Sequence, residues 1–283
     1  MKIRNALPKV KFGSTLRLFL ILLLTVPETG KAAFELDSPG PRATALGGAG
    51  VALVGDLWSP LRNPALAAEA PGGAGMSWSQ QFELPELSRE AICVNSTVRQ
   101  LSVAIRGTNF GSKLYREGEF GLIIAYPLKN QVSLGAELTG KWIGIQDYST
   151  GSAVAVGLGI LVHPVNALRI GAVWSNLNSP RLTNYSDRIG EALRVGLMAR
   201  VTDEAVLVAD VVQEEHFPAE FRGGLEARLL PNFHLRVGIR AEPVRPSAGF
   251  QFRVGRWGFN YGGDLHPDLG PSHEIGMEVR FGK

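Results

Sequence analysis

The sequence contains one cysteine, Cys93, among 283 residues. A single cysteine excludes an intramolecular disulfide and a cysteine metal cluster, and a buried, small apolar role is expected for it rather than that of a reactive thiol. The five histidines lack HExxH or other paired spacing, and neither GxSxG nor a P-loop occurs. His216 beside Glu214 and Glu215, and the 264–268 segment, are interpreted as polar loop residues rather than metal ligands. The sequence therefore predicts no catalytic residue, no metal, no cofactor and no enzyme.

Runs of one charge and long apolar runs are also scarce. Charged residues make up 19% of the chain, the formal net charge is +3, and no basic cluster suggests a nucleic-acid partner. After Val26, no apolar run reaches the roughly 18 residues of a membrane helix. The run at 18–26 follows a basic stretch, and Gly30 and Ala32 are small. We therefore predict a signal peptide over residues 1–32, cleaved after Ala32 or Ala33, with a short anchor helix as the alternative. The mature protein is expected to leave the cytoplasm.

Small residues and proline dominate the next segment, 33–73. Three glycines, Gly47, Gly48 and Gly50, permit close backbone approach and unusual dihedral angles. Asp56 can cap a short turn, and Pro64 favours an extended Asn63 before another helical turn. Interspersed large apolar side chains argue against the alternative, a disordered linker. We predict a compact plug with short helices.

From residue 74 to 283 the chain predicts strands, because apolar residues recur at every second position. About fourteen strands are expected, at 75–82, 90–95, 100–108, 120–128, 132–142, 152–162, 167–175, 193–201, 205–212, 221–229, 233–239, 248–254, 257–262 and 274–281. Longer connections are expected after odd-numbered strands, at 109–119, 143–151, 176–192, 213–220 and 263–273. Short turns after even-numbered strands give the asymmetry of membrane barrels.

Alternation alone fits a soluble barrel or sandwich as well as a membrane barrel, in which the apolar face points outward. Several aromatic residues near strand ends fit interfacial girdles, namely Tyr126, Trp142, Trp174, Trp257 and Tyr261. Fourteen strands enclose more space than wall side chains fill, and a plug is available. Closure also leaves no sheet edge in lipid. The expected fold is therefore an all-β, transmembrane antiparallel β-barrel of about 14 strands, with a hatch of short helices in its lumen.

In that arrangement a set of arginines faces inward: Arg106, Arg169, Arg194, Arg200, Arg222, Arg228, Arg236, Arg240, Arg253 and Arg280. Their expected partners are Glu137, Asp210, Glu226 and Glu278. The favoured interpretation is a ladder of ion pairs that holds the plug to the wall. The functional alternative is an electropositive lumen that attracts the head group of an anionic amphiphile, such as a fatty acid.

The segment ALGGAGVALVGDLWSPLRNPALAA resembles the N-terminal signature of FadL-type outer-membrane transporters and their PorV/PorQ relatives. The matching residues are Ala45, Gly47, Gly48, Ala49, Gly50, Asp56, Asn63, Pro64 and Ala65. Where that pattern usually has two acidic residues, this chain has only Asp56. The resemblance implies a hatch inside an outer-membrane barrel.

The C-terminus resembles the assembly signal of bacterial outer-membrane barrels through Gly276, Val279 and Phe281, although Gly282 and Lys283 follow the aromatic residue. It implies outer-membrane lipid and the barrel assembly machinery as partners. The resemblances imply a PorV/PorQ-type protein acting in transport or in type IX secretion, with secretion-system proteins as partners. The alternative is a FadL-like passive transporter of hydrophobic or amphipathic small molecules. A soluble periplasmic barrel is the third interpretation.

Overall fold

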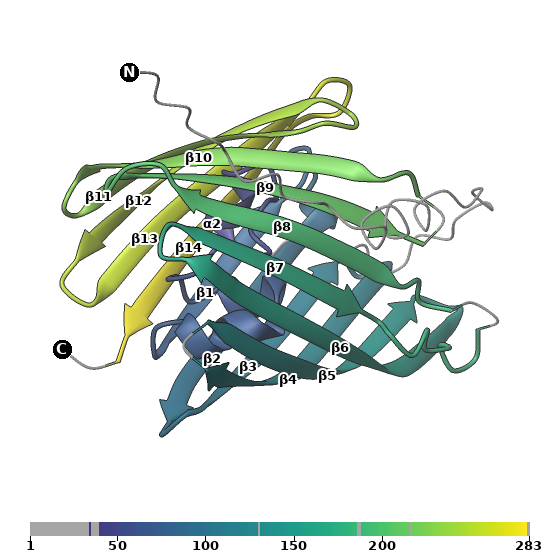
Figure 1. The fold of residues 1–283 in the computed structure, drawn as a ribbon. Helices are drawn as coiled ribbons and strands as arrows, with labels where there is room; N and C mark the ends of the chain where they lie inside the picture. The colour runs from purple at the N-terminus through teal and green to yellow at the C-terminus, as the bar shows by residue number, and fades with distance from the viewer. Residues whose placement is uncertain (1–33, 35–39, 130, 186–187, 216, 282–283) are drawn as a thin grey trace, which may run out of the picture.

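The computed structural model describes residues 34, 40–129, 131–185, 188–215 and 217–281, so the predicted signal peptide at 1–32 lies outside the described residues. Fourteen strands form a closed barrel in which every strand pairs antiparallel with its sequence neighbour and β1 pairs with β14 (Figure 1). Their bounds are β1 Gly73–Gln80, β2 Ser88–Val98, β3 Leu101–Gly111, β4 Tyr115–Lys129, β5 Val132–Ile145, β6 Ser149–Val165, β7 Leu168–Ser175, β8 Ala192–Arg200, β9 Ala205–Glu214, β10 Glu220–Leu230, β11 Phe233–Arg240, β12 Arg245–Val254, β13 Trp257–His266 and β14 Gly270–Arg280. The predicted all-β fold is confirmed.

The apolar side chains point out of the barrel, as β11 shows most clearly. Leu235, Val237 and Ile239 are 43%, 49% and 51% exposed, whereas Arg236 between them is 1% exposed. Successive residues of a strand face opposite sides of the sheet, so these two sets lie on the outer and inner faces. This arrangement is the inverse of a soluble barrel and confirms the predicted sidedness.

The two ends of the barrel differ in the length of their connections. Those after odd-numbered strands have 3 to 16 residues, and those after even-numbered strands have two to four. We call the first end the loop end and the second the turn end. The expected loops at 109–119, 143–151 and 263–273 are mostly strand, so those predicted boundaries were wrong. The backbone ladder continues there, as in the Gly111–Arg116 pair, although the side chains no longer alternate. Alternation marks only the lipid-facing band, while backbone hydrogen bonds extend the hairpins beyond it.

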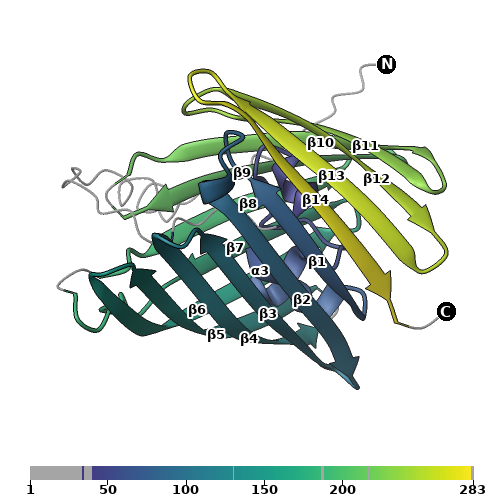
Figure 2. The same ribbon diagram turned by 180° about the vertical axis from the view of Figure 1, so that it is seen from behind.

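The segment from residue 40 to 72 lies inside the barrel as a plug (Figures 1 and 2). It contains α2 (Pro41–Thr44), α3 (Ser59–Arg62) and the 3₁₀ helix η1 (Pro64–Glu69); a second 3₁₀ helix, η2 (Pro85–Leu87), lies in the first loop. Helix α2 packs against β12, β13 and β14, and η1 packs against β3 to β6. Among the described residues, none of the helices is long and apolar enough to span a bilayer.

Glycines in the wall allow the plug to approach the strands at backbone distance. A side chain at Gly238 of β11 would overlap the backbone of Leu46 and Gly47, and one at Gly135 of β5 would overlap Pro64. Between these contacts, the plug contributes fully buried side chains to the core, including Leu46, Leu53, Trp58 and Leu66. The interior therefore consists of plug and wall together, and the lumen at this level is filled by protein.

Candidate functional site: the plug and its contacts with the barrel wall

The glycine-rich turn of the plug places two backbone donors on one wall carboxylate. Gly47, Gly48 and Gly50 all have positive φ, at 70°, 80° and 153°, which favours glycine over other residues. The turn directs the N–H groups of Gly50 and Val51 at Oδ2 of Asp210 on β9, at 2.6 and 3.0 Å. Consecutive N–H groups of this kind form a concave anion site. In this protein, the anion that occupies it belongs to the barrel.

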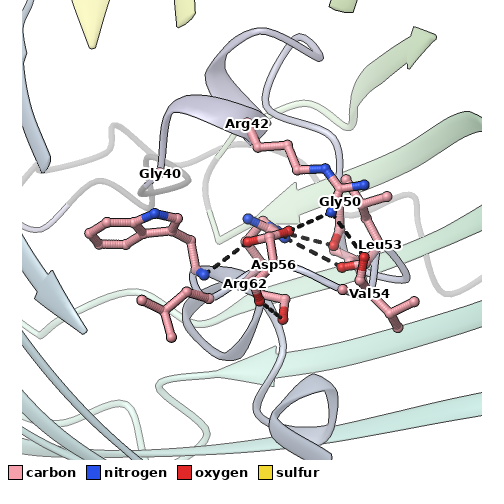
Figure 3. A network of polar contacts seen from close by, with 12 residues as sticks. Gly40, Arg42, Gly50, Leu53, Val54, Asp56 and Arg62 are labelled. Carbon is pink, nitrogen blue, oxygen red and sulfur yellow. Dashed lines mark hydrogen bonds and ion pairs between the residues drawn. The ribbon is translucent and has the colours of Figure 1, made fainter. Parts of the chain in front are cut away.

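Asp56 is the centre of the plug's internal network (Figure 3). Its carboxylate accepts hydrogen bonds from Arg42 at 2.9 Å, from Arg62 at 2.5 Å and from the N–H of Trp58 at 2.9 Å. Burial by itself raises the pKa of Asp56, but the charges of Arg62 and Arg42 outweigh it, so the pKa is lowered from 3.8. Asp56 is therefore an anion that holds three parts of the plug together.

Arg42 carries this network across to the wall. Its guanidinium makes two hydrogen bonds to Glu226 of β10, Nε to Oε2 at 2.8 Å and Nη2 to Oε1 at 2.7 Å. Glu226 also accepts from Nε of Arg236 on β11 at 2.6 Å. Paired, charge-assisted bonds of this type are strong and fix orientation. The chain Asp56–Arg42–Glu226–Arg236 thus joins the centre of the plug to two strands.

Asn63 and Pro64 fix the other half of the plug. The side-chain oxygen of Asn63 accepts from the N–H of Ala65 at 3.0 Å, which caps η1. Its amide nitrogen donates to the carbonyls of Val51, 3.0 Å away, and of Ile160 in β6, 3.1 Å away. All four groups are buried or partly buried, so one asparagine joins the start of η1, the glycine-rich turn and the wall.

The predicted lumen arginines differ in how far they are buried. Arg194, Arg222 and Arg236 are buried, Arg240, Arg253 and Arg280 are partly buried, and Arg200 and Arg228 are exposed near the turn end. Several share carboxylates: Arg222 and Arg240 pair with Glu220 at 2.9 and 3.0 Å, and Arg253 pairs with Glu278 at 2.7 Å.

Two residues of the C-terminal motif, Gly276 and Val279, lie on β14, which closes the barrel, and Phe281 follows directly after it. Gly276 faces the lumen beside Pro41 of α2. Val279 and Phe281 follow the outward alternation, and the N–H of Phe281 donates to the carbonyl of Gly72 at 2.8 Å. The role of these residues as an assembly signal stays a prediction.

Sequence reasoning missed the plug's own charges, Arg42 and Arg62, and the wall carboxylate Glu274. Glu274 accepts from the N–H of Gly40 at 2.9 Å and from the hydroxyl of Thr44 at 2.5 Å. A signal was present, because ionic side chains in a segment otherwise made of small and apolar residues must find partners when buried. Cys93 is buried as predicted, with its thiol 3.4 Å from the carbonyl of Leu57 in the plug.

A pocket of about 70 Å³ lies between plug and wall at the loop end. Thr44, Gly47 and Gly48 supply its plug side. Three basic residues, Arg89, Arg240 and Arg245, supply its wall together with Phe82, Asp264, His273 and Glu274. The guanidinium of Arg245 also lies over the ring of Phe82, 5.8 Å from its centroid. A molecule in this pocket would contact the plug, a cationic wall and an aromatic ring at once.

No family model and no curated protein matches this chain. Several solved structures share its fold at low sequence identity. The CymD monoaromatic hydrocarbon channel has a TM-score of 0.66 at 14% identity, covering 89% of this chain and 100% of that one. A Pseudomonas aeruginosa FadL homologue has a TM-score of 0.62 at 10% identity, covering 89% and 100%. The Pseudomonas putida toluene transporter TodX has a TM-score of 0.63 at 11% identity, covering 88% and 98%. These likenesses show the fold of FadL-like channels and, with the apolar exterior, place the chain in the bacterial outer membrane.

Proposed function

We propose that this outer-membrane barrel, which has the fold of FadL-like channels, is a passive conduit for amphipathic small molecules. The pocket at the loop end carries the proposal, because its wall belongs to the barrel and its inner side belongs to the plug. A ligand that enters the pocket from outside therefore contacts the plug, which is the part of the protein that blocks its passage. The named neighbours include a hydrocarbon channel and a toluene transporter, and that chemistry is extended to this chain only by analogy.

The residues of the pocket favour an amphiphile with an anionic head group. Three arginines and two carboxylates, Asp264 and Glu274, line it, and Arg240 also pairs with Glu220 at 3.0 Å. Arginine offers planar, paired donors that fit a carboxylate, while Phe82 offers an apolar surface for the first part of a tail. A fatty acid has this combination, whereas a plain hydrocarbon has no group that forms an ion pair with a guanidinium.

The contacts that hold the plug beside the pocket are ones that a bound anion can displace. Glu274 holds Gly40 and Thr44 through hydrogen bonds, and Thr44 and Glu274 both line the pocket. An anion beside these residues competes with Glu274 for nearby donors and repels its carboxylate. The central network around Asp56 and Glu226 lies deeper, so the α2 end of the plug is the part we expect to move first.

The test is uptake of radiolabelled oleate by cells that lack their own outer-membrane fatty-acid transporter and express this chain. The double variant Arg89→Ala/Arg245→Ala should lower the initial rate at least about fivefold, since each charge-assisted bond to a carboxylate contributes roughly 1.5–3 kcal/mol. Arg228→Ala, at the exposed turn end, is the matched control and should keep the wild-type rate. Hexadecane uptake distinguishes head-group recognition from a general loss of passage. Absence of oleate uptake above the empty vector would refute the proposal.

A PorV/PorQ-like role in type IX secretion is the second candidate. The small volume of the pocket and the buried ion pair between Arg42 of the plug and Glu226 of the wall favour it, because a lumen closed in this way leaves little room for a passing molecule. In that role the protein would bind secretion-system proteins and pass no small molecule. Co-purification of such partners from a native host, with no oleate uptake, would favour this candidate over the conduit.

A further inference from the structure

A groove on the outer face of the barrel crosses the strand pair β1–β14 that closes it. The groove has a volume of about 490 Å³ and receives side chains from β1, β12, β13 and β14, which lie together in Figure 2. Its walls are large apolar side chains that are exposed on the outside: Met76, Trp78, Phe250, Phe259, Ile275 and Met277. The volume lies within the range of about 300–1,000 Å³ that is typical of small-molecule sites.

The floor of the groove is bare backbone. Ser77, Gly276 and Asn260 stand side by side across β1, β14 and β13. Gly276 has no side chain, and the side chain of Asn260 lies on the lumen side, where it accepts from Arg236 at 3.3 Å. Behind Gly276 lies Pro41 of α2. Nothing therefore rises from the floor toward the lipid, and one layer of backbone separates the groove from the plug.

The wall of the groove on the side toward the loops has a polar rim. Tyr261 lines the groove, and its hydroxyl lies 2.8 Å from Nδ1 of His273, with which it forms a hydrogen bond. His273 stands two residues before Ile275 on β14, toward the loop end. A tyrosine with an apolar ring and a polar tip is typical of the membrane interface. The groove is thus apolar inside, with a polar rim on the side toward the loop end.

We propose that this groove binds one acyl chain of an outer-leaflet lipid, with the polar part of that lipid beside Tyr261 and His273. The groove is continuous with the lipid-facing surface, so its natural neighbours are lipids. A flexible chain fills a narrow, aromatic-walled groove over bare backbone better than the broad side-chain surface of another protein does. The polar rim favours an amphiphile over a hydrocarbon. A chain held there seals the β1–β14 pair from outside, opposite α2.

The test is native mass spectrometry of the full barrel in micelles that contain palmitoyl-oleoyl phosphatidylglycerol. The wild type should retain one lipid per barrel after most detergent is removed. Met277→Trp fills the groove and should weaken retention about tenfold, the loss expected when about two methylene contacts are displaced. Leu197→Trp on β8 is the matched control, because Leu197 and Met277 are 37% and 38% exposed on the same outer face. It should retain lipid like the wild type.

Two further variants make the outcome decisive. Ile275→Phe fills the groove by a different side chain and replaces Met277→Trp if that variant fails to show heat-modifiable mobility of a folded barrel. His273→Ala leaves the apolar walls intact and should weaken lipid retention less than either filling variant. Equal retention in the wild type, the filling variants and Leu197→Trp would overturn the proposal. So would a wild-type adduct with the mass of a second barrel in place of lipid. Oleate uptake does not enter this test.

Discussion

At the scale of single residues, three buried wall carboxylates hold the plug in three different ways. Asp210 binds backbone N–H groups, Glu226 binds the guanidinium of Arg42, and Glu274 binds an N–H and a hydroxyl of the α2 region. Each is at most 7% exposed. Removing one partner of such a buried contact leaves the other without compensation, which typically costs about 3–5 kcal/mol for an ion pair.

The plug should therefore depend on Asp56. Asp56→Asn removes the negative charge between Arg42 and Arg62, and we expect faster amide hydrogen exchange across residues 40–66 by a factor of at least about 100, equivalent to roughly 3 kcal/mol. Arg228→Ala, which removes an exposed ion pair with Glu204 at 3.7 Å, should change plug exchange by less than about fivefold. Unchanged exchange in Asp56→Asn would show that the network does not hold the plug.

Asp56 also makes the stability of the plug depend on pH, and the direction of its pKa shift fixes the sign of that dependence. The pKa of Asp56 is lower in the folded protein than its usual 3.8, so the unfolded plug takes up its proton first. This group contributes stability above pH 3.8 that is lost as pH falls through the folded pKa. Protease protection of the plug should be constant between about pH 7 and 5 and should fall below about pH 4. Asp56→Asn should lack this Asp56-dependent acid step, and an identical acid profile would contradict the assignment.

At the scale of elements, periodicity predicted the existence of all fourteen strands but misplaced several ends. A period of two is imposed by lipid on one side and the plug on the other, so it fades where a hairpin leaves the membrane. Arg116 to Glu119 belong to β4 because their backbone pairs with β3 and β5, which no side-chain pattern reveals. Likewise, the inward side of Arg236 followed from alternation, but its partners depend on strand register and on Arg42 from the plug.

Contact between plug and wall glycines gives a prediction at this scale. Gly238→Val places a side chain against the backbone of Leu46 and Gly47, and overpacking of this kind costs about 1–3 kcal/mol or more. We expect the barrel to fold with a loosened plug, seen as faster proteolysis of the 40–72 segment and higher single-channel conductance in planar bilayers. Gly140→Val on β5 meets only ordinary contact, 3.9 Å from the carbonyl of Phe120, and should behave as wild type. Wild-type conductance and proteolysis in Gly238→Val would mean that close backbone contact is dispensable.

At the scale of the whole molecule, the sequence allowed two barrels of opposite sidedness. Alternation is the same in both, and the choice rested on strand number, aromatic placement and a segment able to fill the lumen. The structure joins these features, because the plug supplies the apolar core and the ionic partners that the inner wall requires. The pocket at the loop end was beyond sequence reasoning, since it combines Arg89 and Phe82 from the first hairpin with Arg240 and Arg245 from β11 and β12.

The sidedness of β11 and β12 tests the account most directly. In a Cys93→Ala background, nitroxide labels at Val237→Cys and Gln251→Cys in lipid bilayers report whether each position meets lipid or water. Val237 is 49% exposed on the outer face and Gln251 is 6% exposed inside. We predict that the label at position 237 collides with oxygen dissolved in lipid and is shielded from a water-soluble nickel chelate, whereas the label at position 251 meets neither freely. Chelate access at 237, with lipid contact at 251, would contradict the membrane barrel and its plug together.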